Sequence, residues 1–157
     1  IDGYRATNTG FGISYALPIV LSTLVLTSKQ CNDFKHSFVD DWYSELHDKH
    51  KILMIENPEA HIHPTGQTKL GILAVLAAKS GVQVLVETHS DHFIDGVRIA
   101  CKESNFSEET IINYFTKDVD SQSDVEKILV LPNGELSNWP KGFFDQINLN
   151  LYRLARM

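Results

Sequence analysis

Cysteine is scarce in this sequence, whose 157 residues include only Cys31 and Cys101. The two lie far apart, and neither belongs to a CxxC pair of the kind found in many zinc sites and redox motifs. This pattern is typical of unpaired thiols in a reducing compartment, where disulfides seldom form. We therefore expect a cytoplasmic protein whose fold does not depend on disulfides.

Long apolar runs are missing as well. The longest, ALPIVLSTLVL at residues 16–26, is shorter than the roughly 20 residues that a helix needs to span a bilayer. It also lacks the basic start of a secretory signal peptide. We expect no membrane anchor in this chain.

Basic runs are also missing, and the net charge is −6. An acidic balance argues against a surface built mainly to bind nucleic acid, although it is compatible with a local basic patch. The hydrophobic content of 43% and the length suit one globular domain spanning residues 1–157. Because the first residue is Ile1, we expect the chain to be part of a longer protein.

The first expected helix begins at Ile13, where apolar residues start to recur at helical spacing. We expect Pro18 to lie in its first turn, where a missing N–H costs little. One stripe of this helix is expected to be buried, and it consists of Ile13, Ala16, Leu17, Val20, Leu21 and Leu24. The polar segment 28–50, which contains four scattered aromatic residues, is interpreted as a short helix between loops.

Two strands and two further helices are expected to follow in alternation. Ile52–Ile55 is an uninterrupted apolar run of the kind buried on both faces of a parallel sheet, and VQVLVE at 82–87 predicts a second strand. A helix over 65–80, stopped by Gly81, separates them, and another follows the second strand with apolar positions Phe93, Val97 and Ala100. Strand, helix, strand, helix predicts an α/β fold with a mostly parallel, doubly wound sheet.

The pattern changes after Asn105. TIINYF at 110–115 and VEKILVL at 125–131 read as strands, and the pair Asn133-Gly134 predicts a hairpin turn. We therefore expect the sheet to end in antiparallel strands. The last segment predicts a final amphipathic helix.

The first candidate site is the stretch ILMIENPEAHIHP, residues 52–64, in which a buried strand runs directly into titratable side chains. Four apolar residues are followed by Glu56, Asn57, Pro58 and Glu59, and then by two histidines. Acids at the carboxyl end of a parallel strand commonly hold a metal ion or a phosphate. We interpret this segment as functional rather than as a merely solvated strand end.

Two further segments support this interpretation. VLVETHSDH at 84–92 is a neighbouring strand that also ends in titratable groups. Among these, His89 falls at the edge of the sheet where ligands bind. Ser90 or Asp91 can simply cap the next helix. NTGFGISYALP at 8–18 is a glycine-rich stretch that leads into a helix, a weak phosphate-binding signal when taken alone. Together the three segments predict an acid, an imidazole and free backbone N–H groups in one site.

These segments resemble ABC-type ATPase heads. ILMIENPEAHIHP resembles their Walker B and D-loop segment, in the branch that includes overcoming-lysogenization-defect nucleases and chromosome-maintenance and recombination ATPases, and VLVETHS resembles the switch strand with its histidine. NTGFGIS stands in the place of the ABC signature, in the variant form of a family of bacterial AAA-type ATPases whose C-terminal domain has no assigned function. WPKGFFD at 139–145 resembles the tail of that family. The resemblance implies the C-terminal lobe of a P-loop NTPase-like fold.

The resemblance also implies a role for each matching residue. Glu56 corresponds to the Walker B acid, which holds Mg²⁺ through water beside the phosphates of ATP. His89 corresponds to the histidine that contacts the γ-phosphate and stabilises charge there. Gly12 and Ser14 belong to the signature turn, which caps ATP bound to the opposite head of a homodimer.

Two departures from the family pattern affect the expected activity. The resemblance places Asn57 beside the nucleotide, at the position where these heads usually have a glutamate that orients the attacking water. An amide does not accept a proton from that water. Glu59 or His89 then serves as the base, or turnover is slow. The sequence also has no GxxxxGK[ST] phosphate loop, so we expect that loop on an upstream N-terminal lobe.

Two other functions stay open at this stage. A metal-dependent hydrolase would use His61, His63 and His89, whereas the resemblance implies that His61 and His63 lie in the D-loop region at the dimer seam without binding metal. A non-catalytic module for dimerisation or effector docking is the second alternative, because Asn57 weakens the catalytic case. Nucleic acid and an effector protein are both open as further partners, as is a role in phage defence.

Overall fold

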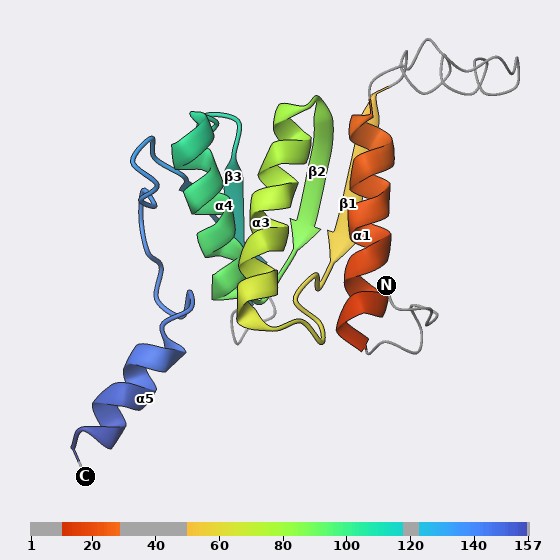
Figure 1. The fold of residues 1–157 in the computed structure, drawn as a ribbon. Helices are drawn as coiled ribbons and strands as arrows, with labels where there is room; N and C mark the ends of the chain where they lie inside the picture. Colours follow the sequence, from red (N-terminus) through yellow and green to blue (C-terminus); the bar gives the residue numbers. More distant parts are fainter. Residues whose placement is uncertain (1–10, 29–49, 118–122, 157) are drawn as a thin grey trace, which may run out of the picture. The chain divides into compact units, whose positions relative to one another are not determined.

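The computed structural model describes residues 11–28, 50–117 and 123–156 (Figure 1). The chain divides into two compact units, Ile1–Ala100 and Cys101–Met157, which are described separately below. The segment 29–49, most of the polar stretch interpreted above as a short helix, lies outside the described residues. The expectation of one domain over the whole chain stays a prediction.

The first unit is a parallel pair of strands covered by helices. It contains α1 (Phe11–Thr27), β1 (Lys51–Glu56), α3 (Pro64–Lys79), β2 (Val82–Glu87) and most of α4 (Asp91–Ser104). The two strands pair in parallel along their whole length, from Lys51 opposite Val82 to Glu56 opposite Glu87. The predicted alternation of strands and helices is confirmed.

The helix over 65–80 is confirmed as α3, and its end has the expected physical cause. Gly81 has a φ of 89°, a left-handed conformation that glycine adopts without steric cost and that ends the helix. The predicted apolar face of α4 is also confirmed, because Phe93, Val97 and Ala100 are buried. No helix in the described ranges has both the length and the apolar character needed to cross a membrane.

The prediction for Pro18 is wrong. The helix α1 begins at Phe11, so Pro18 lies inside it rather than in its first turn. A proline in a helix interior lacks the N–H that would donate to the carbonyl four residues earlier. Phe11 and Gly12, which precede Ile13, also lie within α1.

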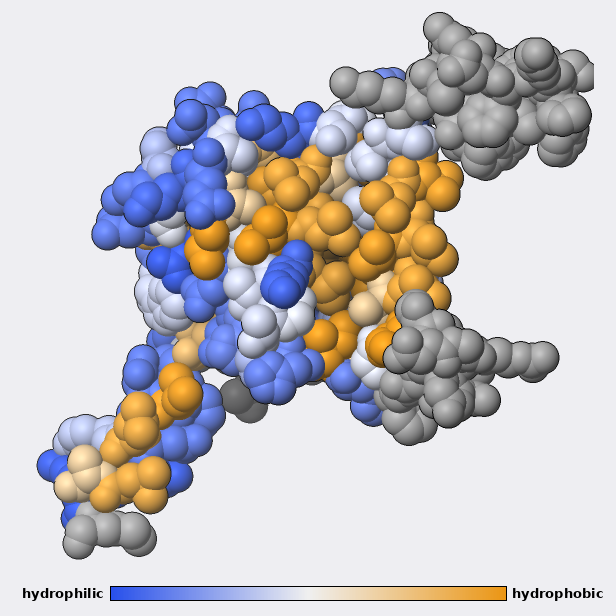
Figure 2. Space-filling model, viewed as in Figure 1, coloured by the Kyte–Doolittle hydropathy of each residue, from blue (hydrophilic) through white to orange (hydrophobic). Residues whose placement is uncertain are grey.

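The predicted buried stripe of α1 is also wrong, because Ile13, Leu21 and Leu24 are exposed. Ile19 and Leu26 lie on the buried side of this helix. They pack against a core cluster of Leu53, Ile55 and Val82. The helix is apolar all around, so periodicity alone does not identify the buried side. Figure 2 shows the resulting apolar surface over α1.

The expectation that β1 is buried on both faces is wrong for the described residues. Leu53 and Ile55 are buried beneath the helices, whereas Ile52 and Met54 on the opposite face are 52% and 75% exposed. Successive side chains in a strand point to opposite faces, and α1 and α3 cover the same one (Figure 1). The other face, with Leu85 of β2 alongside, is apolar and uncovered.

The second unit contains an antiparallel strand pair, β3 (Ile111–Lys117) and β4 (Ser123–Leu129), and the helix α5 (Gln146–Leu154). Among the described residues these strands form a sheet of their own rather than extending the parallel pair. The turn at Asn133-Gly134 is confirmed, because it reverses the chain between the bridged residues Val130 and Leu136.

The core of the second unit is built around Ile128, Val130 and Phe143, all buried. The ring of Phe143 contacts those of Tyr114 and Trp139 edge to face, with centroid distances of 5.3 and 5.2 Å. The predicted helix at the end of the chain is confirmed as α5, and Ile147, Leu151 and Leu154 form an exposed apolar stripe along it (Figure 2).

Cys101 is a free, buried thiol, as the sequence predicts, and its sulfur donates a hydrogen bond to Thr110 Oγ1 at 3.2 Å. Burial raises the pKa of this thiol, because the thiolate would lose its hydration, although the hydrogen bond with Thr110 acts in the opposite direction. The neutral thiol is the less nucleophilic form, so Cys101 has the character of a core residue rather than a reactive one.

The contact between α3 and α4 generates a stability prediction. A Cβ atom at Gly96 would overlap the carbonyl oxygen of Thr68, and one at Gly71 would overlap that of Phe93. We expect Gly96→Ala and Gly71→Ala each to lower the free energy of unfolding by about 1–3 kcal/mol in urea titrations, because the helices must separate.

The matched control is Gly66→Ala in the first turn of α3, where the new methyl group would meet only the side chain of Ile62. That side chain can move, and alanine favours the helix, so a smaller change is expected. Equal stability of Gly96→Ala and the unsubstituted chain would contradict the close packing.

Candidate functional site

The carboxyl ends of β1 and β2 define one edge of the parallel sheet. Glu56 and Glu87 are paired directly opposite each other at the last position of the register. Both are exposed, and they lie on the same face of the sheet because paired residues share a face. The prediction that the two acid-ended strands meet at one edge is confirmed.

The loop Asn57–His63, here named the β1–α3 loop, turns away immediately after Glu56. Asn57 donates its backbone N–H to the carbonyl of Glu87 at 2.9 Å, and its φ of 47° is left-handed. Asparagine tolerates this conformation better than most residues do. Pro58 is fully buried, so the start of the loop is anchored against the fold.

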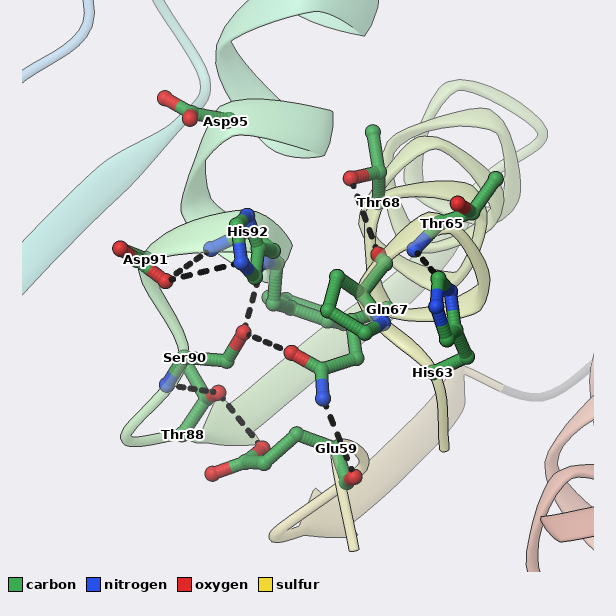
Figure 3. Close-up of polar contacts among 12 residues, drawn as sticks. Glu59, His63, Thr65, Gln67, Thr68, Thr88, Ser90, Asp91, His92 and Asp95 are labelled. Atoms are coloured by element: carbon green, nitrogen blue, oxygen red, sulfur yellow. Dashed lines mark hydrogen bonds and ion pairs between the residues drawn. The ribbon is translucent and has the colours of Figure 1, made fainter. Parts of the chain in front are cut away.

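Glu59 joins this loop to the end of β2. Its Oε2 accepts a hydrogen bond from Thr88 Oγ1 and its Oε1 accepts one from the backbone N–H of His89, each at 2.7 Å. Figure 3 shows the Glu59 carboxylate next to Thr88. Both bonds are short and have an ionised acceptor, which makes them stronger than neutral hydrogen bonds.

Gln67 on α3 makes a second link between the same segments. Its Nε2 donates to the backbone oxygen of Ile62 at 2.7 Å. Its Oε1 accepts from the buried Ser90 Oγ at 2.6 Å, a contact that Figure 3 shows. Ser90 Oγ in turn accepts from the N–H of Phe93 at 3.0 Å. Ser90 therefore caps α4, as the sequence suggested.

The side chain of His89 extends into solvent from the loop between β2 and α4. It is 79% exposed, and its Nε2 lies 3.9 Å from Glu87 Oε1. The backbone of His89 is held by Glu59, whereas its imidazole is accessible to a ligand. This arrangement suits a side chain that contacts a bound group.

Gly12 and Ser14 lie in the first turn of α1, beside the β1–α3 loop. A Cβ atom at Gly12 would come within 2.9 Å of the carbonyl oxygen of His61, so only glycine fits there without movement. The ring of Tyr15 packs against that of His61 at 5.0 Å. An open cleft of about 360 Å³ lies between α1 and the end of β1, and its lining includes Ser14, Glu56 and Asn57.

The three histidines of the metal-hydrolase alternative have separate environments. His61 packs on Tyr15, His63 accepts a hydrogen bond from Thr65 N at 3.4 Å as the N-cap of α3, and His89 lies near Glu87. The described part of the chain contains no group of three histidine, cysteine or acidic side chains placed to hold a metal ion. The structure therefore does not bring the predicted zinc ligands together.

Sequence reasoning missed several residues of this edge. Glu87 was not singled out, although its position opposite Glu56 follows once the two strands are paired in parallel. Thr88 lies within the VLVETHS motif but was given no role, and Gln67 belongs to no motif; their contacts join segments that are far apart in the sequence. The pairing of Glu56 with Glu87 follows only from the parallel register, and no local sequence pattern predicts the hydrogen bonds of Gln67.

The chemistry of this edge fits a hard divalent cation. Glu56 and Glu87 place two exposed carboxylate side chains on neighbouring strands at the same edge. Oxygen ligands are those that Mg²⁺ prefers, and it commonly uses one or two carboxylates together with water and phosphate oxygens. Glu56 is thus a suitable residue to hold Mg²⁺, with Glu87 as its neighbour.

The fold and this edge together define an α/β protein of the P-loop NTPase-like class. The AAA ATPase domain family matches residues 2–94, more than half of the chain, and the chain belongs to that family. Residues 107–154 match a second family, described as a protein of unknown function (DUF3696). No curated protein and no solved structure matches the chain.

These matches confirm the resemblance to bacterial AAA-type ATPases whose C-terminal domain has no assigned function. The two matched ranges fall in different compact units, the first before Ala100 and the second after Cys101. Membership in an ATPase family supports ATP binding and hydrolysis at a general level, and such proteins typically bind the nucleotide together with Mg²⁺.

The separate environments of the histidines generate a prediction about metal content. We expect purified protein to contain less than about 0.1 equivalent of zinc, because a zinc site needs three or four converging ligands. Elemental analysis measures this directly. A stoichiometric zinc that chelators remove together with stability would contradict it.

Proposed function

We propose that this chain is part of an ABC-type ATPase head that acts in the cytoplasm as a homodimer. In this arrangement ATP is sandwiched between the phosphate loop of one head and the Gly12–Ser14 segment of the other, and its binding and hydrolysis drive a conformational switch. The observation that carries the proposal is the meeting of Glu56 and the His89-bearing loop at one edge of a parallel sheet in an AAA ATPase family member.

Each residue at the edge has a proposed role. Glu56 would hold Mg²⁺, and Asn57 would lie beside the nucleotide. His89 contacts the γ-phosphate through its exposed imidazole. The bound metal supplies positive charge that offsets the charge of the phosphate oxygens.

The exposed surfaces of the first unit support an association with further protein. Within the described part of the first unit, Ile52, Met54 and Leu85 form an exposed apolar sheet face, and monomeric proteins seldom leave such faces in water. We propose that an upstream N-terminal lobe with the missing phosphate loop packs there. The further proposed partners are the second head of the dimer and either nucleic acid or an effector protein. Phage defence is one proposed biological role.

The missing phosphate loop generates a prediction for the chain alone. We expect these 157 residues neither to bind nor to hydrolyse ATP appreciably, because no GxxxxGK[ST] segment is present to hold the phosphates. Calorimetric titration with Mg-ATP should give no binding heat. Micromolar affinity of the isolated chain would contradict the division of the site between two lobes.

A second prediction concerns the intact protein with its phosphate loop. Glu56→Gln should lower ATP turnover by about 10²–10³-fold by removing the charge that holds Mg²⁺, and His89→Ala by a similar factor through loss of a preorganised contact. The measurement is steady-state phosphate release. His92→Ala is the matched control, because His92 is also an exposed histidine but belongs to α4, where its Nε2 lies 3.8 Å from Asp91 Oδ1.

The double variant with both Glu56 and His89 replaced decides the proposal. Normal ATP hydrolysis by that variant would refute the ATPase assignment of this edge. If the unsubstituted intact protein binds ATP without turning it over, the chain belongs instead to a non-catalytic module, the alternative that Asn57 favours.

A further inference from the structure

The loop Thr88–Ser90, here named the β2–α4 loop, is joined at two points to the β1–α3 loop and at a third to α3. Glu59 binds the hydroxyl of Thr88 and the backbone N–H of His89, and Gln67 binds Ser90. Every residue of the β2–α4 loop thus has a direct hydrogen bond to the loop or helix that follows β1. His89 lies at the centre of this set.

The backbone of Glu59 is itself held in place by neighbouring residues. Its backbone oxygen accepts a hydrogen bond from the N–H of Ile62 at 3.1 Å and a longer one from Gln67 Nε2 at 3.4 Å. The preceding Pro58 is fully buried. The carboxylate therefore projects from an anchored backbone, and its position is set before any ligand binds.

The contacts of the carboxylate distinguish two roles for Glu59. A general base must direct a carboxylate oxygen at the water whose proton it accepts. Both oxygens of Glu59 instead accept hydrogen bonds from the β2–α4 loop, at 2.7 Å each. These contacts serve to hold a backbone segment, and the side chain of the held residue, His89, is the exposed one.

We propose that Glu59 is a positioning residue, which fixes the β2–α4 loop so that the imidazole of His89 is presented to the γ-phosphate. This inference rests on the proposed function, which assigns the phosphate contact to His89. It replaces the general-base role that the sequence left open for Glu59. Gln67 and Ser90 hold the far side of the same loop.

The glutamine variant separates the two roles. In Glu59→Gln the amide oxygen can still accept from the N–H of His89, and the amide N–H can donate to Thr88 Oγ1, but the side chain no longer accepts a proton. A positioning residue predicts that the intact protein keeps ATP turnover within about fivefold of the unsubstituted protein, whereas Glu59→Ala lowers it by about 10²-fold through misplacement of His89. Glu103→Ala, an exposed glutamate on α4, is the matched control.

A second measurement does not depend on ATP turnover. The backbone N–H of His89 is exposed but donates a hydrogen bond to Glu59. In the intact protein without nucleotide, its hydrogen exchange should therefore be slower than that of an exposed amide without a hydrogen bond. We expect exchange at this amide to be at least about tenfold faster in Glu59→Ala and nearly unchanged in Glu59→Gln. Absence of turnover in the unsubstituted protein would refute the proposed function and leave this measurement decisive for positioning.

Thr88 provides an independent pair of variants if Glu59→Ala does not fold. Thr88→Val removes the hydroxyl that donates to Glu59, whereas Thr88→Ser keeps it. The proposal predicts loss of turnover and faster His89 exchange in the valine variant only. Equal losses of turnover in Glu59→Gln and Glu59→Ala, or His89 exchange that is unaffected in Glu59→Ala and Thr88→Val, would overturn it.

Discussion

The parallel pairing of β1 with β2 is the constraint on which the site depends. In a parallel pair both carboxyl ends fall at the same edge, and the register here places Glu56 opposite Glu87. The two loops that leave this edge then start side by side, which allows Glu59 to reach Thr88 and His89 although they are 29 and 30 residues away in sequence. A shift of one residue in the register would turn the side chains of one strand to the opposite face and separate the two acids.

The surface of the first unit carries features that are normally buried. The helix α1 is apolar on every side, and it exposes Leu21, Leu24 and Val25. The uncovered sheet face adds Ile52 and Met54 on another side of the same unit. Apolar surface of this extent is stabilised when other protein covers it, and both faces lie on elements that end at the site. Covering them would therefore also restrain the elements that carry Glu56 and Gly12.

The sequence predicted the elements well where local pattern determines them. Gly81 stops α3 and Asn133-Gly134 forms its turn because backbone conformation there depends on one or two residues. The sequence did not predict which side of α1 is buried, because a helix that is apolar throughout shows no periodic contrast between its sides. It also did not predict that Pro18 lies inside α1, because tertiary contacts decide where that helix begins. The site residues Glu56 and His89 came from motifs, whereas the links through Gln67 and Thr88 depend on contacts between distant segments.

The positions of Asn57 and Glu59 bear on how such a site can work. Asn57 has an amide, which does not accept a proton, and its left-handed backbone turns the chain away from the sheet edge. If Glu59 holds the β2–α4 loop, neither residue is free to deprotonate water, and the other carboxylates at the edge, Glu56 and Glu87, are those suited to hold Mg²⁺. His89, the other base that the sequence left open, is assigned to the γ-phosphate in the proposed function, so the water would have to lose its proton late and without a strong base. Hydrolysis would be slow relative to binding, so the ATP-bound state would be long-lived, which suits a conformational switch better than a fast motor.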